Sequence, residues 1–578
     1  MAVRQSFPTR GVLRRPALRW VDVVVAAAIL ALLYAVVRLG QSVTVPFEPS
    51  HAVRNFSTDP ARLPGYALRS LSRMFLALGL SVGFTFVYGT AAARSRRAEK
   101  VLIPALDVLQ SVPVLGFLSI TVAGFIALFP HSLLGLECAS IFAIFTSQAW
   151  NMTFSFYHSL VTQPRELDEA ARVLRLSKWQ RFWKLDVPSS MIGLVWNGMM
   201  SFGGAWFFLT ASEAITVNKR SYALPGIGSY VAAASRDADL GKVLLAIVVM
   251  IVMVLAVNFL FWRPMVAWSE RFRNEQTEAI EQPRSVVLDT LRRSRVPTLL
   301  GRPLRPVTVG LDRATRVFGT ADRPLTTSPA RRRAGDTLFG LAVAALAIWG
   351  ASTALGYVSR TVGLDQFPHA FWLGFVTFLR VVIVVVVSTL IWVPVGVKIG
   401  MSPRLARYAQ PVVQILASFP ANFLFPFAAA FFIATSISLD VGGIALMALG
   451  AQWYILFNTI AGAMSIPSDL REAMDNFGIR GWQRWRRLIL PAIFPFYVTG
   501  GITAAGGAWN ASIVAEIVTY GHHVLIATGL GAYIAQSTAT GDFAKTLTGI
   551  IVMSVYVVAV NRLVWRRLFR LAETRFSL

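Results

Sequence analysis

Long apolar runs alternate with short polar stretches along the whole chain. A transmembrane helix needs roughly 20 predominantly apolar residues, and runs of about this length recur from end to end. The pattern therefore predicts an all-α membrane protein with about twelve transmembrane helices. In the first half they are expected at 21–39, 71–93, 103–128, 133–157, 193–211 and 243–262, and in the second half at 337–357, 374–396, 410–434, 439–463, 495–517 and 546–564.

Two of the polar stretches are copies of each other. We call residues 168–188 the first island and residues 471–491 the second island. An offset of 303 positions relates Glu169 to Glu472, and the same offset relates Pro188 to Pro491. Each island lies between matched apolar runs, so each is predicted to be a polar, basic helix outside the bilayer.

The repeat extends far beyond the islands. The offset of 303 also relates Glu213 to Glu516, whereas earlier in each half the offset is 307, as between Arg73 and Arg380. Each half has an even number of predicted helices and the linker stays on one side, so the halves are expected to have the same orientation. Such a parallel repeat can enclose one pathway at the shared interface.

The basic residues predict the domain organisation and the orientation. Arg and Lys gather in the islands, in the centre of the chain and near the C-terminus, as in short cytoplasmic segments of membrane proteins. The domains expected are a cytoplasmic segment at 1–20, a first membrane-spanning half at 21–262, a basic cytoplasmic linker at 263–335 and a second membrane-spanning half at 336–578. Both termini are expected to be cytoplasmic.

Charge and composition exclude several classes of protein. The formal net charge is +26, but only 15% of residues are charged and 55% are hydrophobic. The bases lie between apolar runs rather than on one basic face, so the lipid bilayer and not nucleic acid is the expected partner. Cys138 is the single cysteine, which excludes a disulfide framework.

No catalytic or cofactor site stands out. No stretch fits G-x-x-x-x-G-K-[ST], so the chain has no P-loop for a nucleotide. His522 and His523 are adjacent, and neighbouring side chains of an extended chain point to opposite sides, which disfavours a shared metal. We therefore expect a non-enzymatic chain that binds no metal or cofactor itself.

The islands resemble the cytoplasmic signature of permease subunits of binding-protein-dependent ABC importers. That signature reads roughly E-A-A-x-x-x-G, followed by a leucine-proline pair. This sequence departs from it, with Arg175 at the glycine position, Met474 at the second alanine and Val187 at the leucine. The residues that match the signature or follow it directly are Glu169, Ala170, Ala171, Arg172, Glu472, Ala473 and Gly478.

The resemblance implies a function for the islands and a set of partners. Each island would be a coupling helix that docks on an ABC ATPase dimer in the cytoplasm, and that ATPase would bind ATP and Mg. A periplasmic or lipid-anchored solute-binding protein would deliver the solute. The protein would be a multi-pass component of the bacterial cytoplasmic (inner) membrane, similar to type I ABC importer permeases.

Other stretches resemble one branch of that family. The stretches are Gln110-Ser111-Val112-Pro113, Ala508-Trp509-Asn510 and 529–534. They are similar to permeases of the nitrate/sulfonate/taurine/bicarbonate group in a duplicated, fused form, which implies import of a small anion.

Several paired residues are candidates for the translocation pathway or its gate. Acids at membrane depth, Glu213 and Glu516, are functional candidates by default, but a bare carboxylate would repel an anion, so structural or gating roles are favoured. Arg73 and Arg380 are expected to attract an anion, to pair with these glutamates, or to reach lipid headgroups. The remaining candidates are Pro113, Trp206, Pro420, Trp509 and Asn510.

Trp206 and Trp509 each follow a Gly-Gly-Ala step, where small residues permit close helix approach, so they are either constrictions of the pathway or ordinary interfacial anchors. Pro113 and Pro420 are expected to break their helices. The loops 218–232 and 521–535 are expected to re-enter the membrane.

Three alternatives stay open. A secondary transporter also shows parallel repeats, although it does not need matched E-A-A helices. A fused ABC permease for another cargo, such as ferric iron or a vitamin precursor, is a nearer rival. A membrane enzyme is disfavoured because no acid/base or metal cluster is visible.

Overall fold

The computed structural model describes residues 56–129, 132–217, 220–272, 285–294 and 329–575, together with a few isolated positions. The expected cytoplasmic segment 1–20 lies outside the described residues. So do most of the expected helix at 21–39 and most of the linker 263–335.

The first half is almost entirely helical. Its long helices are those predicted from the apolar runs, and two short strands follow the fifth of them. The elements are α2 (Leu63–Arg94), α3 (Arg96–Ser111), α4 (Val114–Leu128), α5 (Leu134–Val161), α6 (Arg165–Val173), α7 (Lys178–Arg181), α8 (Val187–Glu213), β1 (Ala214–Val217), β2 (Arg220–Ala223), α9 (Ile227–Arg236), α10 (Leu240–Val257) and α11 (Arg263–Ser269), and α12 (Val286–Arg293) lies in the linker.

The second half repeats this order. Its elements are α15 (Pro329–Thr361), α16 (Gln366–Gly400), α17 (Pro403–Ser418), α18 (Phe425–Thr435), α19 (Leu439–Met464), α20 (Ser468–Asn476), α21 (Gly481–Arg484), α22 (Leu490–Ala515), β3 (Ile517–Tyr520), β4 (His523–Ile526), α23 (Leu530–Thr540), α24 (Phe543–Val560) and α25 (Arg566–Arg575).

The count of spanning helices covers only the described residues, which leave out most of the expected helix at 21–39. Among the described residues, 8 helices are long and apolar enough to cross a membrane, or up to 9 if one bent pair counts as a single span. The run 103–128 is split between α3 and α4 because Pro113 interrupts it. Helix α5 is 28 residues long but carries Glu137, Gln148 and Asn151, which lower its hydropathy.

The broken helices of each half pack against the other half. In the first half, α3 and α4 are separated at Pro113 and contact α22 and α24 of the second half. In the second half, α17 and α18 are separated near Pro420 by a bend of 80° and contact α8 and α10 of the first half. The expected breaks at both prolines are therefore present, and each broken helix lies at the interface between the halves.

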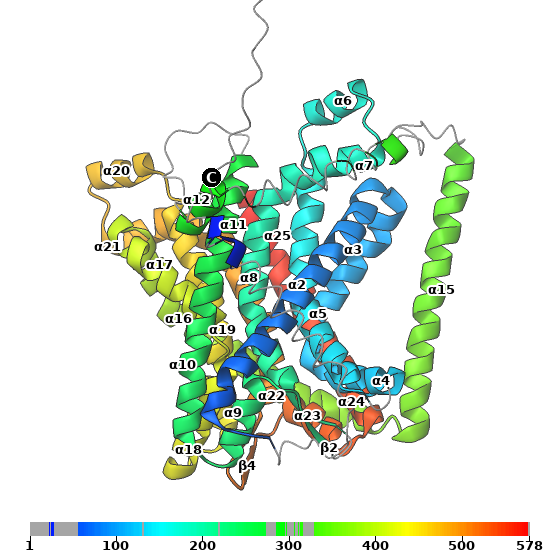
Figure 1. Cartoon of the computed structure of the whole chain (residues 1–578), viewed down its shortest axis with the longest axis vertical. Coiled ribbons are helices and arrows are strands. Elements are labelled where there is room, and N and C mark those ends of the chain that lie inside the picture. Colours follow the sequence, from blue (N-terminus) through cyan, green and yellow to red (C-terminus); the bar gives the residue numbers. More distant parts are fainter. Residues whose placement is uncertain are drawn as a thin grey trace, which may run out of the picture.

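Both islands lie at the same end of the molecule. In Figure 1, α6 and α7 of the first island and α20 and α21 of the second lie at the top, near the C-terminal helix α25. Helices α9, α18 and α23 and strand β4 lie at the opposite end. We call these the island end and the hairpin end. This arrangement fits the parallel orientation predicted for the halves.

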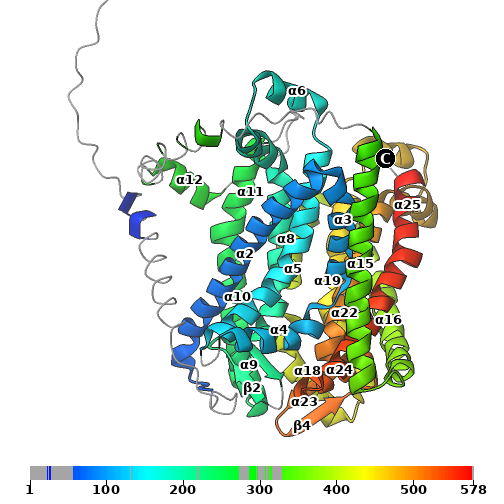
Figure 2. The ribbon, with the colours of Figure 1, turned by 90° about the vertical axis from the view of Figure 1, so that its right-hand side faces the viewer.

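Helix α15 stands at the side of the bundle. It contacts α24 of its own half and α3 of the first half, and Figure 2 shows it running along the outside of the bundle beside α3. None of the residues in its most apolar segment is buried within the chain. Large apolar side chains such as Leu346, Ile348 and Trp349 are exposed on it, as expected of a helix that faces lipid.

A β-hairpin lies at the start of each loop that the sequence predicted to re-enter the membrane. Each α8 or α22 is followed by a two-stranded antiparallel hairpin, β1–β2 or β3–β4, and then by α9 or α23. In the second hairpin a two-residue connection joins Tyr520 to His523, and Gly521 has a φ of 58°, a left-handed conformation that glycine adopts without strain. The strands are only four residues long, and Glu213 or Glu516 stands directly before the first strand of each hairpin.

Candidate functional site

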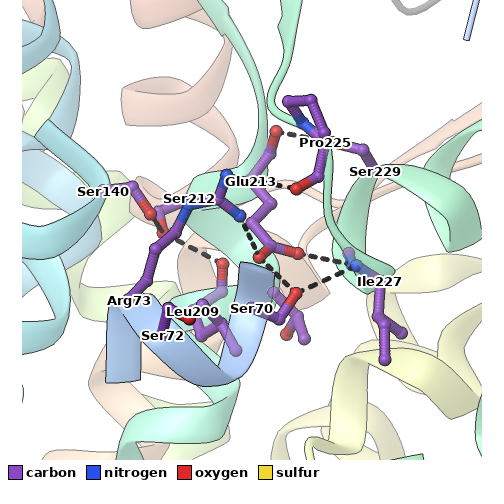
Figure 3. Close-up of polar contacts among 12 residues, drawn as sticks. Ser70, Ser72, Arg73, Ser140, Leu209, Ser212, Glu213, Pro225, Ile227 and Ser229 are labelled. Atoms are coloured by element: carbon purple, nitrogen blue, oxygen red, sulfur yellow. Dashed lines mark hydrogen bonds and ion pairs between the residues drawn. The ribbon is translucent and has the colours of Figure 1, made fainter. Parts of the chain in front are cut away.

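A buried ion-pair cluster lies at the hairpin end of the first half (Figure 3). The guanidinium of Arg73 on α2 donates to both oxygens of Glu137 on α5, and its Nη1 donates to Glu213 Oε1 on α8 over 2.6 Å. Its Nη2 also donates to the carbonyl of Pro225 over 3.1 Å. Arg73 therefore joins three helices to the segment that follows the first hairpin.

Glu213 also binds the start of α9. Its Oε1 accepts a hydrogen bond from Ser70 Oγ at 2.6 Å, and its Oε2 accepts one from the backbone N–H of Gly228 at 2.7 Å. A carboxylate at a helix N-terminus is favoured by the helix dipole. A Cβ at Gly226 would overlap this carboxylate, so the glycine is required by the close approach.

The second half contains the same cluster. Arg380 Nη1 donates to Glu516 Oε1 at 2.9 Å, and Nη2 donates to Asp440 Oδ1 at 2.7 Å. Thr377 takes the place of Ser70 and donates to Glu516 over 2.8 Å. Glu516 accepts from the backbone N–H of Ala532, at the start of α23.

The pairing of arginines with glutamates is one of the possibilities that the sequence left open. Sequence reasoning did not include the second acids, Glu137 and Asp440, nor the hydroxyls of Ser70 and Thr377. The repeat could have identified the second acids, because Glu137 and Asp440 are related by the offset of 303 and both lie at the start of an apolar helix. Each arginine faces two carboxylates, so neither cluster has a spare positive charge for an anion.

The first island ends its helix in a left-handed residue. After α6, the N–H of Leu176 donates to the carbonyl of Ala171 and the N–H of Arg175 donates to that of Arg172, which is the Schellman pattern. Arg175 has a φ of 48°. The second island makes the same two bonds, with Gly478 at the left-handed position and a φ of 66°. The first island therefore has the same left-handed backbone as the second, although Arg175 stands where the second island has Gly478.

Both islands expose apolar side chains. Val173 is 82% exposed on the first island and Phe477 is 79% exposed on the second. Glu169 and Glu472 are also exposed, as are Ala170 and Arg172, whereas Ala171 is buried and Ala473 partly buried. Each island therefore presents both an exposed acid and an exposed large apolar side chain.

Residues near the two breaks tie the halves together. Asn510 on α22 accepts a hydrogen bond from the backbone N–H of Val114, directly after Pro113, at 3.0 Å. Asn422, two residues after Pro420, bonds through its amide to the Thr210 hydroxyl on α8 at 2.8 Å. The structure therefore brings Pro113, Pro420 and Asn510 to the interface between the halves.

The two tryptophans are buried within their own halves. Trp206 packs edge-on against Phe202, and Trp509 packs against Tyr556 at a ring distance of 6.0 Å. Both are 1% exposed. Trp206 also lines a small cavity that Gln414 and Ser418 of the second half close. A constriction role for either ring stays a prediction.

At the hairpin end, α9 of the first half is hydrogen-bonded to the second hairpin. Ser235 Oγ donates to the carbonyl of Thr519 at 3.1 Å, and the N–H of Gly521 donates to the carbonyl of Ser235 at 2.9 Å. The Tyr520 hydroxyl donates to the carbonyl of Ala238 at 3.3 Å. These bonds hold the halves together at the end opposite the islands.

The chain is similar to several transport proteins. It is 25% identical over 205 residues to the nitrate import permease NrtB of Leptolyngbya laminosa, covering 36% of this chain and 69% of that protein. It is 27% identical over 204 residues to the bicarbonate transport system permease CmpB of Synechococcus elongatus, covering 35% and 68%. It is 28% identical over 161 residues to the putative aliphatic sulfonates transport permease SsuC of Bacillus subtilis, covering 28% and 55%.

One family matches both halves. Residues 79–266 and 392–576 each match the family described as binding-protein-dependent transport system inner membrane component. The two matches together span more than half of the chain and contain both islands. The chain therefore belongs to the inner-membrane components of binding-protein-dependent transport systems, as a duplicated, non-catalytic permease of the ABC importer type.

Proposed function

We propose that this chain forms the translocation pathway of an ATP-driven importer for a small anion such as nitrate, a sulfonate, taurine or bicarbonate. The names of the relatives support this class of cargo, because they refer to nitrate, bicarbonate and aliphatic sulfonates. The observation that carries the transport mechanism is the pair of matched islands at one end of two halves that meet along their broken helices.

The islands are the docking sites for two copies of a cytoplasmic ATPase, which hold ATP and Mg. Each island offers a short helix with an exposed acid and an exposed apolar tip, Val173 or Phe477. A π-helical turn then leads directly into α8 or α22, which lie at the interface between the halves. Movement of a docked ATPase is therefore passed to the interface through a continuous helix.

The ion-pair clusters act structurally. Arg73 and Arg380 use their donors on carboxylates and backbone carbonyls of their own half, so they are not free to bind cargo. Glu213 and Glu516 are each neutralised by an arginine, which lessens the repulsion that a bare carboxylate would exert on an anion. Their task is to fix the hairpins and the helices α9 and α23 against the bundle.

Transport proceeds by alternating access between the halves. In the arrangement described, hydrogen bonds between α9 and the second hairpin hold the hairpin end together. Opening toward the hairpin end must break them. A solute-binding protein docks at that end, which faces the periplasm, while the islands and both termini lie in the cytoplasm.

Reconstitution tests this proposal. The chain is placed in lipid vesicles with its ATPase inside and its solute-binding protein outside, and uptake of labelled nitrate, bicarbonate and taurine is measured with and without ATP. We expect uptake of one of these anions only when ATP and both partners are present. Gradient-driven uptake by the chain alone would instead support a secondary transporter, and uptake of ferric iron or a vitamin precursor would overturn the anion assignment.

A further inference from the structure

A cavity of ≈ 50 Å³ lies between the two halves. Helix α8 forms one wall, and α19, α22 and the bend after α17 form the others. The Gly-Gly step of α8, Gly203-Gly204, faces the cavity together with Gly507 of α22. The glycine pairs of the two halves therefore meet at the same point on the interface.

The wall of this cavity carries few polar groups. Among the described residues that line it, none is Asp, Glu, Lys, Arg or His, and the polar side chains are the phenol of Tyr454, the amide of Asn510 and the indole of Trp453. The ion-pair clusters belong to the hairpin end and do not contribute to it. An anion in the cavity would meet hydrogen-bond donors and no fixed charge.

Tyr454 extends from α19 of the second half to the backbone of α8 in the first half. A Cβ at Gly204 would lie 3.0 Å from its hydroxyl oxygen, and a Cβ at Gly507 would lie 3.4 Å from its Cε2. Its hydroxyl has no hydrogen-bond partner among the described residues. The two glycines thus make room for a phenol whose O–H is available to a third molecule.

The repeat indicates that Tyr454 is specific to one half. The matched position in the first half is Asn151, whose amide donates to Ser201 Oγ at 3.2 Å within that half. Tyr454 is partly buried and lines the cavity, so its hydroxyl can bond to a water or a solute there. Tyr454 therefore departs from the symmetry by offering a hydroxyl donor to whatever occupies the cavity.

Asn510 is held in place from both sides. Its Oδ1 accepts from the N–H of Val114, and its Nδ2 donates to the carbonyl of Gly506 at 3.1 Å. An amide nitrogen has two N–H donors, so one remains after this bond. Tyr454 and Asn510 together supply two neutral donors to the same cavity.

We propose that this cavity is the point at which the transported anion is selected, with Tyr454 donating a hydrogen bond to it. This inference rests on the proposed function. A site for one water takes roughly 10–15 Å³, so the cavity has room for about three to five water-sized atoms. A planar nitrate or bicarbonate fits this space, whereas taurine and alkyl sulfonates, with a tetrahedral sulfonate on a carbon chain, are larger.

Equilibrium binding to the purified transporter complex tests the proposal, with labelled nitrate, bicarbonate and taurine as probes and no solute-binding protein present. We expect nitrate or bicarbonate to bind and taurine to bind at least tenfold more weakly. Tyr454→Phe keeps the ring and removes the donor, so it should weaken binding of the preferred anion by about tenfold or more. Gly204→Ala, which crowds the same hydroxyl, should weaken it as well.

Tyr497→Phe is the matched control. It makes the same chemical change in the same half, but its hydroxyl bonds to Thr389 and does not line the cavity, so binding should stay within about twofold of the parent. Unchanged binding in Tyr454→Phe, or taurine binding as tight as nitrate binding, would overturn this inference alone. ATP-driven uptake of an anion by the parent protein would still support the proposed function.

Discussion

The two halves match closely at the hairpin end and differ at the island end. At the hairpin end, Arg73 with Glu137 and Glu213 is reproduced by Arg380 with Asp440 and Glu516. A buried charge that loses its partner is strongly destabilising, so each member of a cluster constrains the others. Both copies have kept the same chemistry.

The islands have diverged within the same backbone. In the first island, Ser177 and Gln180 form a capping box, and Asp186 pairs with Arg94. In the second island Ile489 stands at the position of Asp186, and Trp482 is 71% exposed where Trp179 is 38% exposed. Ser177, Gln180 and Asp186 are buried, so the islands have diverged both in the packing beneath them and, at the tryptophans, on the exposed surface.

Reversing the charge of both island glutamates should have the largest effect. Glu169 and Glu472 are exposed, so Glu169→Lys with Glu472→Lys leaves the bundle unchanged but places two wrong charges against the docked ATPase. We expect ATP-driven uptake to be abolished and the ATPase to be lost during co-purification. Normal uptake by the double variant would show that the island glutamates do not couple the ATPase to transport. Glu166→Lys, in the first turn of α6 outside the signature, is the control.

Removing the arginine of a cluster should cost the most stability. Arg73→Met leaves two carboxylates without their partner, and breaking a buried ion pair costs about 3–5 kcal/mol. Arg380→Met should cost less, because Asp440 is 48% exposed and can be solvated, whereas Glu137 is 14% exposed. Thermal unfolding of the two variants in the same detergent measures the difference. A greater loss for Arg380→Met would contradict the ranking.

A methyl group at the start of α23 should have an intermediate effect. In Gly531→Ala the new Cβ would lie 2.5 Å from the carbonyl oxygen of Ser512, a backbone atom that cannot move aside. Overpacking of this kind costs about 1–3 kcal/mol in the free energy of unfolding. Gly79→Ala on α2 is the control, because a Cβ there meets nothing within 4 Å. Equal stability of the two variants would refute the steric argument.

Exchanging the residues at the left-handed position should have the smallest effect, with opposite signs in the two islands. Arg175→Gly relieves a left-handed non-glycine residue and should stabilise the first island by about 1 kcal/mol, whereas Gly478→Arg should destabilise the second by a similar amount. A Cβ at Gly478 meets nothing within 4 Å, so only the backbone conformation is tested. Hydrogen exchange of the island amides measures both, and changes of the same sign would contradict the prediction.

The sequence predicted the repeat, the islands and most long helices, because each depends on a pattern that is local or recurs at a fixed offset. It did not predict the hairpins, whose strands are only four residues long. Among the described residues, expected spans are not recognised by length and hydropathy where a helix carries buried polar groups, as α5 does with Gln148, or is broken by a proline, as at Pro113.

The site was predictable in part. The arginines and glutamates stood out because charges at membrane depth are rare, but their partners were hidden by distance in the sequence, as with Glu137. Tyr454 gave no signal at all, since one tyrosine in an apolar helix looks like any other core aromatic. Only the packing of Gly204 and Gly507 around it reveals an unpartnered hydroxyl. The domain boundaries proposed from the sequence remain predictions.

Site-specific photo-crosslinking tests the central claim most directly. A photoreactive residue is placed at Val173, at Phe477 and, as a control at the hairpin end, at His522, in the complete transporter with its ATPase and solute-binding protein. The account predicts crosslinks to the ATPase from both Val173 and Phe477, and none from His522. Crosslinks to the ATPase from His522, or from neither island, would contradict it.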